Sequence, residues 1–217
     1  CDIQAQISYM DDLLATQTLM EDERNEIRAK IALICYLFCE QDVTGQATGG
    51  HAGLSNMVLA RQLWLPAAVA LVPDHPMYKK WEDYLTKLML FRFADNMAPC
   101  GTWYEPGTYQ EWGYHRLAAG LMGLESMKAP GIDPIFKYHE ACMDYYMNTL
   151  TPHDSRWNAR MIPGYGNSAT HYAGPLADFA ASLAYHNPKL ASNLKWAWIA
   201  NGCGNDFMLG MSKPWIK

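Results

Sequence analysis

Apolar residues recur along most of the chain with the spacing of an α-helix. Between residues 2 and 18 they fall three or four positions apart, beginning with Ile3 and Ile7, and this period places them on one helical face. A second helix begins at the acidic residues 21–23, which suit a helix N-terminus, and its body is apolar on nearly every side as far as Phe38. The pattern predicts an antiparallel helix pair whose second member is buried between neighbours.

Proline and asparagine mark where the later helices begin. A helical pattern covers residues 54–72, and Pro66 within it should kink the helix or split it in two. The dipeptides Asp133-Pro134 and Asn187-Pro188 each supply a capping side chain followed by a first-turn proline. The remaining helices are predicted at about 77–96, 107–127, 133–150, 175–185 and 187–200. Because alternation never persists long enough to indicate a strand, the predicted fold class is all-α, built of helical hairpins.

The same patterns assign the inward faces of some helices. The helix at 77–96 should turn Trp81 and Phe91 inward, and the helix at 133–150 should bury a stripe running from Phe136 through His139 to Tyr146. Six cysteines contain no CxxC pair. Two of them, four positions apart on the apolar second helix, are predicted to be buried thiols: Cys35 and Cys39. The sequence signals no zinc site, and we expect no metal and no cofactor.

Length and charge restrict the classes of protein. At 217 residues the chain fits one domain, or a large part of one, spanning residues 1–217. The balance of 17 basic and 22 acidic residues gives a net charge of −5, which argues against a nucleic-acid partner. No apolar stretch of about 18 residues is present, so no membrane span is expected. The chain starts at Cys1 directly in a helical pattern, which suggests a processed or truncated product of a longer protein.

Residues 100–116 stand out by composition. They read CGTWYEPGTYQEWGYHR and hold two Trp, three Tyr, two Glu, one His and one Arg. Aromatic faces with carboxylates beside a helix start are typical of a carbohydrate subsite. The alternative is that the aromatic rings fill a corner between two helices, and the composition of this stretch alone does not decide between the two.

Three long connections interrupt the helices, at residues 41–53, 97–106 and 151–174. The first contains four glycines and one histidine. The last has no periodicity, and a loop above about 15 residues in a compact domain is usually functional or disordered. Its Trp, Tyr, His and Arg content argues against disorder. Helical hairpins joined by alternating short and long connections should gather these three segments at one end of the array.

Four stretches, taken together and in order, resemble one family. They read HAGLSNM, GTWYEPGTYQEWGYHR, TPHDSRWNARMIPGYGNS and LASNLKWAWIANG, and they cover most of residues 50–202. The ordered set is similar to the α/α-toroid domain of the heparinase II/III-like polysaccharide lyases. The resemblance implies an incomplete α/α toroid, because the family has further helical pairs upstream. It also implies a secreted or periplasmic protein. The β-sandwich domain usual in the family is absent, so further domains of a longer chain are expected partners.

The resemblance implies β-elimination on an acidic, uronic-acid-containing polysaccharide or oligosaccharide. That reaction needs the uronate carboxylate neutralised, the C5 proton removed and the departing O4 protonated. Tyr109 matches the family's tyrosine and is the first candidate for proton transfer. Asn56 matches the carboxylate-neutralising asparagine, and His51 on the same loop could assist. From the residues alone, Tyr109 could equally pack at the helix start, Asn56 could cap a helix, and His51 could simply be exposed.

Further candidates would bind the substrate. Arg160 and Arg156 suit carboxylate or sulfate groups, because a guanidinium pairs bidentately with oxyanions. Without such a target the two arginines would be surface charges. The other members of this predicted set are Glu105, Trp103, Asn167, His171 and Trp64, and Glu105 could instead cap the helix that begins near Gly107. The two tryptophans would stack on sugar rings, although tryptophan is more often a core residue.

Two other functions remain open from the sequence. A glycoside hydrolase on the same toroid would need two carboxylates about 5–10 Å apart. Glu105 and Glu111 are nearby in sequence, and no partner carboxylate elsewhere stands out. The other alternative is a glycan-binding or purely structural helical fragment without catalytic activity.

Overall fold

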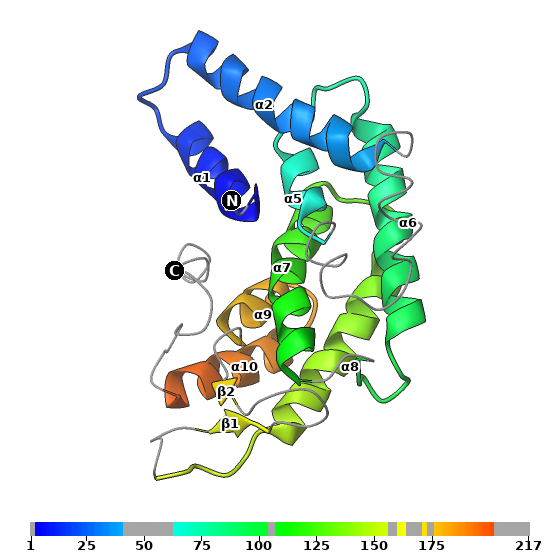
Figure 1. Cartoon of the computed structure of the whole chain (residues 1–217), viewed down its shortest axis with the longest axis vertical. Coiled ribbons are helices and arrows are strands. Elements are labelled where there is room, and N and C mark those ends of the chain that lie inside the picture. The colour runs from blue at the N-terminus through cyan, green and yellow to red at the C-terminus, as the bar shows by residue number, and fades with distance from the viewer. Residues whose placement is uncertain are drawn as a thin grey trace.

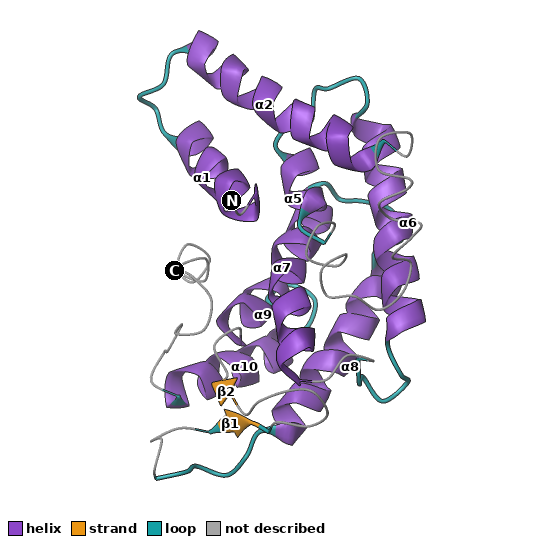
Figure 2. Ribbon diagram, viewed as in Figure 1, coloured by secondary structure: helices purple, strands orange, loops and turns teal. Residues whose placement is uncertain are grey.

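The computed structural model describes residues 3–40, 63–103, 107–155, 160–163, 171–172 and 176–201. Helices dominate this part of the chain (Figure 2), which confirms the predicted all-α class. The helices are α1 (Ile3–Ala15), α2 (Glu21–Cys39), α5 (Leu65–Ala70), α6 (Tyr78–Asn96), α7 (Gly107–Ser126), α8 (Asp133–Thr149), α9 (Leu176–Ser182) and α10 (Pro188–Ala200).

The described helices from α2 onward pack in two rows, and from α5 to α10 successive helices alternate between the rows. Helix α7 packs against both α5 and α9, which makes one row. In the other row α6 packs against α2 and α8, and α8 packs in turn against α10. Contacts of α5 with α2 and α6, and of α9 with α10, join the rows. Figure 1 shows α5, α7 and α9 following one another along the long axis of the molecule.

Local chemistry fixes several of the helix starts. The Glu23 carboxylate accepts the Met20 amide at 2.8 Å, and this bond satisfies a backbone donor at the start of α2. Asn187 caps α10 as predicted, because its side chain accepts the Leu190 amide at 3.0 Å. Pro66 is the second residue of α5, so it begins a helix there rather than kinking one. At α8 the prediction was one position off, because Asp133 is the first helical residue and Ile132 is the cap.

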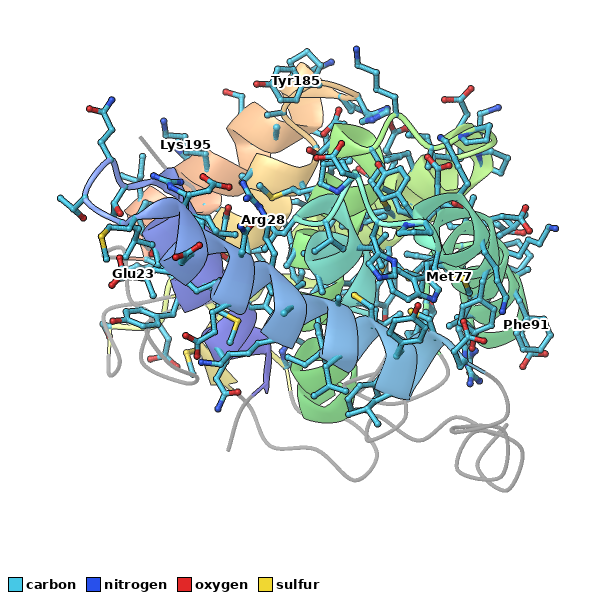
Figure 3. The ribbon with its side chains drawn as sticks, turned by 90° about the horizontal axis from the view of Figure 1, so that it is seen from above. Glu23, Arg28, Met77, Phe91, Tyr185 and Lys195 are labelled. Carbon is cyan, nitrogen blue, oxygen red and sulfur yellow. The ribbon has the colours of Figure 1, made fainter. Side chains whose placement is uncertain are left out.

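The predicted stripe of α8 is confirmed, since its members Phe136, His139, Met143 and Tyr146 are all buried. Two other face predictions were wrong. Helix α2 is not buried all round: Leu33 is 59% exposed, because the neighbours of α2 cover only part of its surface. Phe91 is 54% exposed and lies at the outer edge of the molecule in Figure 3. It follows the buried Trp81 by ten residues, which is not a whole number of helical turns.

Two short strands escaped the sequence prediction. The strands β1 (Met161–Ile162) and β2 (His171–Tyr172) form an antiparallel pair, with Ile162 opposite His171. Two residues are too few for an alternating pattern to appear.

Both predicted thiols of α2 are confirmed as free and buried. Burial raises the pKa of the Cys35 thiol to about 12 and also raises the pKa of Cys39. Neither thiol is therefore a nucleophile near neutral pH. Within the described ranges, no helix combines the length and apolar character needed to cross a membrane.

Candidate functional site

Several predicted functional segments approach one end of the helix array. In Figure 1 the start of α7, the end of α8 and the β1–β2 pair all lie toward the same end of the long axis. The turn at 97–103, which follows the end of α6, lies toward that end as well. Two of the three long connections thus approach one end in their described parts, as predicted. The connection at 41–53 lies outside the described residues.

The turn at 97–103 is held tightly before α7. Ala98 donates its amide to the Thr102 carbonyl at 2.8 Å, and Gly101 donates to the Ala98 carbonyl at 2.9 Å. Gly101 has a φ of +87°, and a Cβ at this position would collide with the Ala141 carbonyl of α8. Glycine is required here for both reasons, so α8 fixes the path of the chain as it enters α7.

The structure places both candidate tryptophans in the core. Trp103 is 3% exposed and packs edge-on against Phe93, with ring centroids 6.2 Å apart. Trp64 is also 3% exposed and packs edge-on against Phe38 at 5.9 Å. Stacking on a sugar needs an open ring face, so the binding role predicted for both residues is corrected to a packing role. Trp103 anchors the chain shortly before α7.

Helix α7 carries Tyr109 as its third residue and is fixed by a close crossing with α5. A Cβ at Gly120 would collide with the Leu63 carbonyl, and one at Gly123 would collide with the backbone of Pro66. These glycines let the two helix backbones approach closely, which sets the axis of α7 and thereby the position of its first turn. The side chain of Tyr109 lies outside the described residues.

Arg160 lies at the base of the 151–172 segment, where four hydrogen bonds join three parts of the chain. The Thr151 amide donates to the Met161 carbonyl at 2.9 Å, and the Met161 amide donates to the Thr151 hydroxyl at 2.8 Å. The Arg160 amide donates to Asn201 Oδ1 at 2.7 Å, just beyond the end of α10. The Arg160 guanidinium donates to the Thr151 carbonyl at 3.2 Å. We call Thr151, Arg160, Met161 and Asn201 the loop staple.

Arg160 is a half-buried residue, and its guanidinium is bonded to a neutral acceptor. Within the described ranges, no carboxylate lies within ion-pair distance of it. The Thr151 carbonyl takes one of the five N–H donors of the guanidinium. The remaining N–H groups of the Arg160 guanidinium suit an oxyanion ligand.

Most other candidates cannot be placed. His51, Asn56, Glu105, Arg156 and Asn167 lie outside the described residues. His171 is placed in β2, but its side chain is not described. Arg160 directly precedes β1, and β1 pairs with the strand that carries His171, with Ile162 opposite His171.

A buried polar cluster between α8 and α9 was not predicted as a unit. His139 is fully buried, and its Nε2 lies 2.8 Å from Ser182 Oγ, which itself donates to the Phe179 carbonyl at 3.0 Å. Burial, aided by the charge of His186, lowers the pKa of His139 to about 3. Nearby on α9, burial raises the pKa of Asp178 to about 7. The imidazole and hydroxyl resemble a nucleophilic pair, but both side chains are buried and no ligand can reach them.

One groove bounded by described side chains lies elsewhere, where the end of α2 meets α6. It encloses about 620 Å³, and Leu88 and Phe91 form part of its wall. Lysines on its rim are already paired with carboxylates, Lys80 with Glu40 and Lys87 with Asp83, each at 2.7 Å. Figure 1 places this junction toward the opposite end of the long axis from the start of α7.

Among the residues that the structure describes, no group of three or more His, Cys, Asp or Glu side chains is arranged to hold a metal ion. Comparisons with protein-family models, with curated proteins and with solved structures return no match. Function is therefore argued from the residues of this chain.

Proposed function

We propose that this protein is a polysaccharide lyase that cleaves an acidic, uronic-acid-containing glycan by β-elimination. The proposed site lies at the end of the helix array where α7 begins. In this proposal the protein works outside the cytoplasm, secreted or in the periplasm, where such glycans are met.

The arrangement of the helices supports the proposal. In an α/α toroid, helical hairpins place one helix of each pair in an inner layer and the other in an outer layer. We interpret the row of α5, α7 and α9 as part of the inner layer and the row of α2, α6, α8 and α10 as part of the outer layer. Tyr109 would then begin an inner helix at the open end of the toroid.

The observation that carries the proposal is the state of Arg160. Arg160 is a half-buried residue directly before β1, which lies at the same end of the molecule as the start of α7, and its guanidinium donates to a backbone carbonyl. A half-buried arginine without a counter-ion among the described residues favours an anionic ligand. A uronate carboxylate or a sulfate group supplies that anion.

The proposed chemistry uses residues from three loops. Arg160 would hold an anionic group of the glycan, and Asn56 with His51 would neutralise the carboxylate beside the reacting C5. A hydrogen bond to that carboxylate stabilises the enolate-like transition state more than the ground state. Tyr109 would transfer the proton, either from C5 or to the departing O4.

Product analysis tests the reaction class. The protein is incubated separately with heparan, chondroitin, hyaluronan and alginate, and the masses of the products are measured by mass spectrometry. Elimination splits the chain without adding water and leaves an unsaturated sugar at one new end. Products that each gain the mass of one water would show a hydrolase instead, and intact polymer in all four incubations would contradict both activities.

A further inference from the structure

The loop staple uses every polar group of Thr151. Its amide and its hydroxyl bond the backbone of Met161, and its carbonyl accepts the Arg160 guanidinium. One threonine therefore fixes both the backbone that carries Arg160 and the direction of the Arg160 side chain. A buried or half-buried residue with all three groups bonded has little freedom to move.

Asn201 fixes the same segment through a second contact. Its Oδ1 accepts the Arg160 amide at 2.7 Å, and its own amide donates to the Ala197 carbonyl at the end of α10. Thr151 follows the end of α8, and α8 packs against α10. Arg160 is thus tied to the ends of two packed helices, which are rigid supports for a binding residue.

We propose that Thr151 and Asn201 are positioning residues that hold Arg160 as the recognition group for an oxyanion of the bound glycan, a carboxylate or a sulfate ester. This inference rests on the proposed function and adds to it the residues that set the preference for acidic substrate. Among the described residues the guanidinium is held through one N–H, to the Thr151 carbonyl, and its other donors suit a bidentate contact with the ligand.

Binding titrations test the inference with three probes of equal length: an alginate tetrasaccharide, a sulfated heparan tetrasaccharide and neutral cellotetraose. Wild-type protein should bind an acidic probe more tightly than cellotetraose. Tighter binding of the sulfated heparan probe would indicate sulfate recognition, and tighter binding of the alginate probe would indicate carboxylate recognition. Arg160→Gln should weaken binding of that probe about tenfold or more and leave cellotetraose unchanged. Arg160→Lys should recover only part of the loss, because it keeps the charge without the planar fork.

The positioning role is tested at Thr151 with a matched pair. Thr151→Val keeps the shape but removes the hydroxyl that accepts the Met161 amide, and it should weaken the acidic probe about 3- to 10-fold. Thr151→Ser keeps the hydroxyl and should bind within about twofold of wild type. Circular dichroism melts of each variant separate loss of folding from loss of binding, and Thr151→Ser serves as the folded reference.

The outcomes separate this inference from the proposed function. Equal affinity of wild type for acidic and neutral probes, or an Arg160→Gln variant that binds like wild type, would overturn the inference. So would a Thr151→Val variant that folds and binds like Thr151→Ser. Arg160-dependent binding without unsaturated product would remove the lyase activity and leave the inference standing. Unsaturated product with the KM of wild type in both Arg160→Gln and Thr151→Val would overturn the inference and leave the lyase activity standing.

Discussion

At the residue scale, His139 ties the stability of the protein to pH. Its pKa is lowered to about 3 in the fold, from an ordinary value of 6.5, because the ring is fully buried. The unfolded chain therefore binds more protons between these values, and stability present above pH 6.5 is lost as the pH falls toward 3. The loss is at most about 3–5 kcal/mol, since one pKa unit corresponds to about 1.4 kcal/mol.

We expect His139→Gln to lose this acid sensitivity. Glutamine keeps an N–H donor for Ser182 but does not titrate, so the free energy of unfolding should decline less between about pH 6.5 and pH 4 than in wild type. Urea unfolding at several pH values measures the slope, which is independent of any uniform destabilisation. His153→Gln, at an exposed histidine, is the control and should keep the wild-type slope. An unchanged slope in His139→Gln would contradict this assignment.

Asp178 changes the stability of the protein with pH in the direction opposite to His139. Its pKa is raised to about 7 from 3.8 by burial, and its Oδ1 is buried without a hydrogen-bond partner in the described structure. The fold favours the protonated acid, so its stabilisation is complete below pH 4 and is lost as the pH rises through 7. The effects of His139 and Asp178 oppose each other between about pH 4 and 6.5.

We predict that Asp178→Asn stabilises the protein at about pH 8 by about 1–3 kcal/mol and changes little near pH 4, because asparagine resembles the protonated acid. Thermal melts at the two pH values measure the difference. Asp144→Asn, at an exposed position on α8, should show no such pH-dependent gain. A loss of stability at the higher pH would mean that the Asp178 carboxylate is satisfied in the fold.

At the scale of elements, the crossing of α7 over α5 determines where the proposed site begins. Gly→Ala within a helix normally stabilises by up to about 1 kcal/mol. At Gly120 the added Cβ would collide with the Leu63 carbonyl, so we expect Gly120→Ala to destabilise by at least about 2 kcal/mol.

Chemical denaturation measures this effect, and Ala119→Gly on the half-buried neighbouring position shows the ordinary helix propensity, a loss of about 1 kcal/mol. Stabilisation by Gly120→Ala would show that the two backbones lie farther apart than the structure places them. Activity of a folded Gly120→Ala variant would additionally report whether the position of α7 matters to the site.

The elements that could be predicted are those with a strong period or a strong cap. The buried stripe of α8 and the Asn187 cap of α10 are both confirmed. The exposed Leu33 and Phe91 were assigned to the interior, because a sequence pattern shows which residues are apolar but not how many neighbours cover them. The β1–β2 pair depends on contacts between distant segments, which no local pattern records.

At the scale of the molecule, the sequence predicted an all-α fold and the convergence of three long connections. The all-α fold is found in the described parts, and two of the three connections approach one end there, while 41–53 lies outside the described residues. The site could be predicted only in part. Arg160 was a candidate from its residue type, but Thr151 and Asn201 were not, since their roles come from hydrogen bonds across 10 and 41 residues. Trp64 and Trp103 show the converse, because burial decides between core and binding surface and is visible only in the fold.

The proposed function assigns proton transfer in an elimination reaction to Tyr109, and the formation of the unsaturated product shows whether Tyr109 has this role. The ultraviolet absorbance of the new C4–C5 double bond is followed while wild type, Tyr109→Phe and Tyr185→Phe act on the acidic polymers. Tyr185 is 85% exposed and serves as the matched control. We predict that absorbance rises for wild type and Tyr185→Phe and is reduced by about 10²-fold or more for Tyr109→Phe. No rise with wild type on any polymer, or an equal rise with Tyr109→Phe, would contradict the claim.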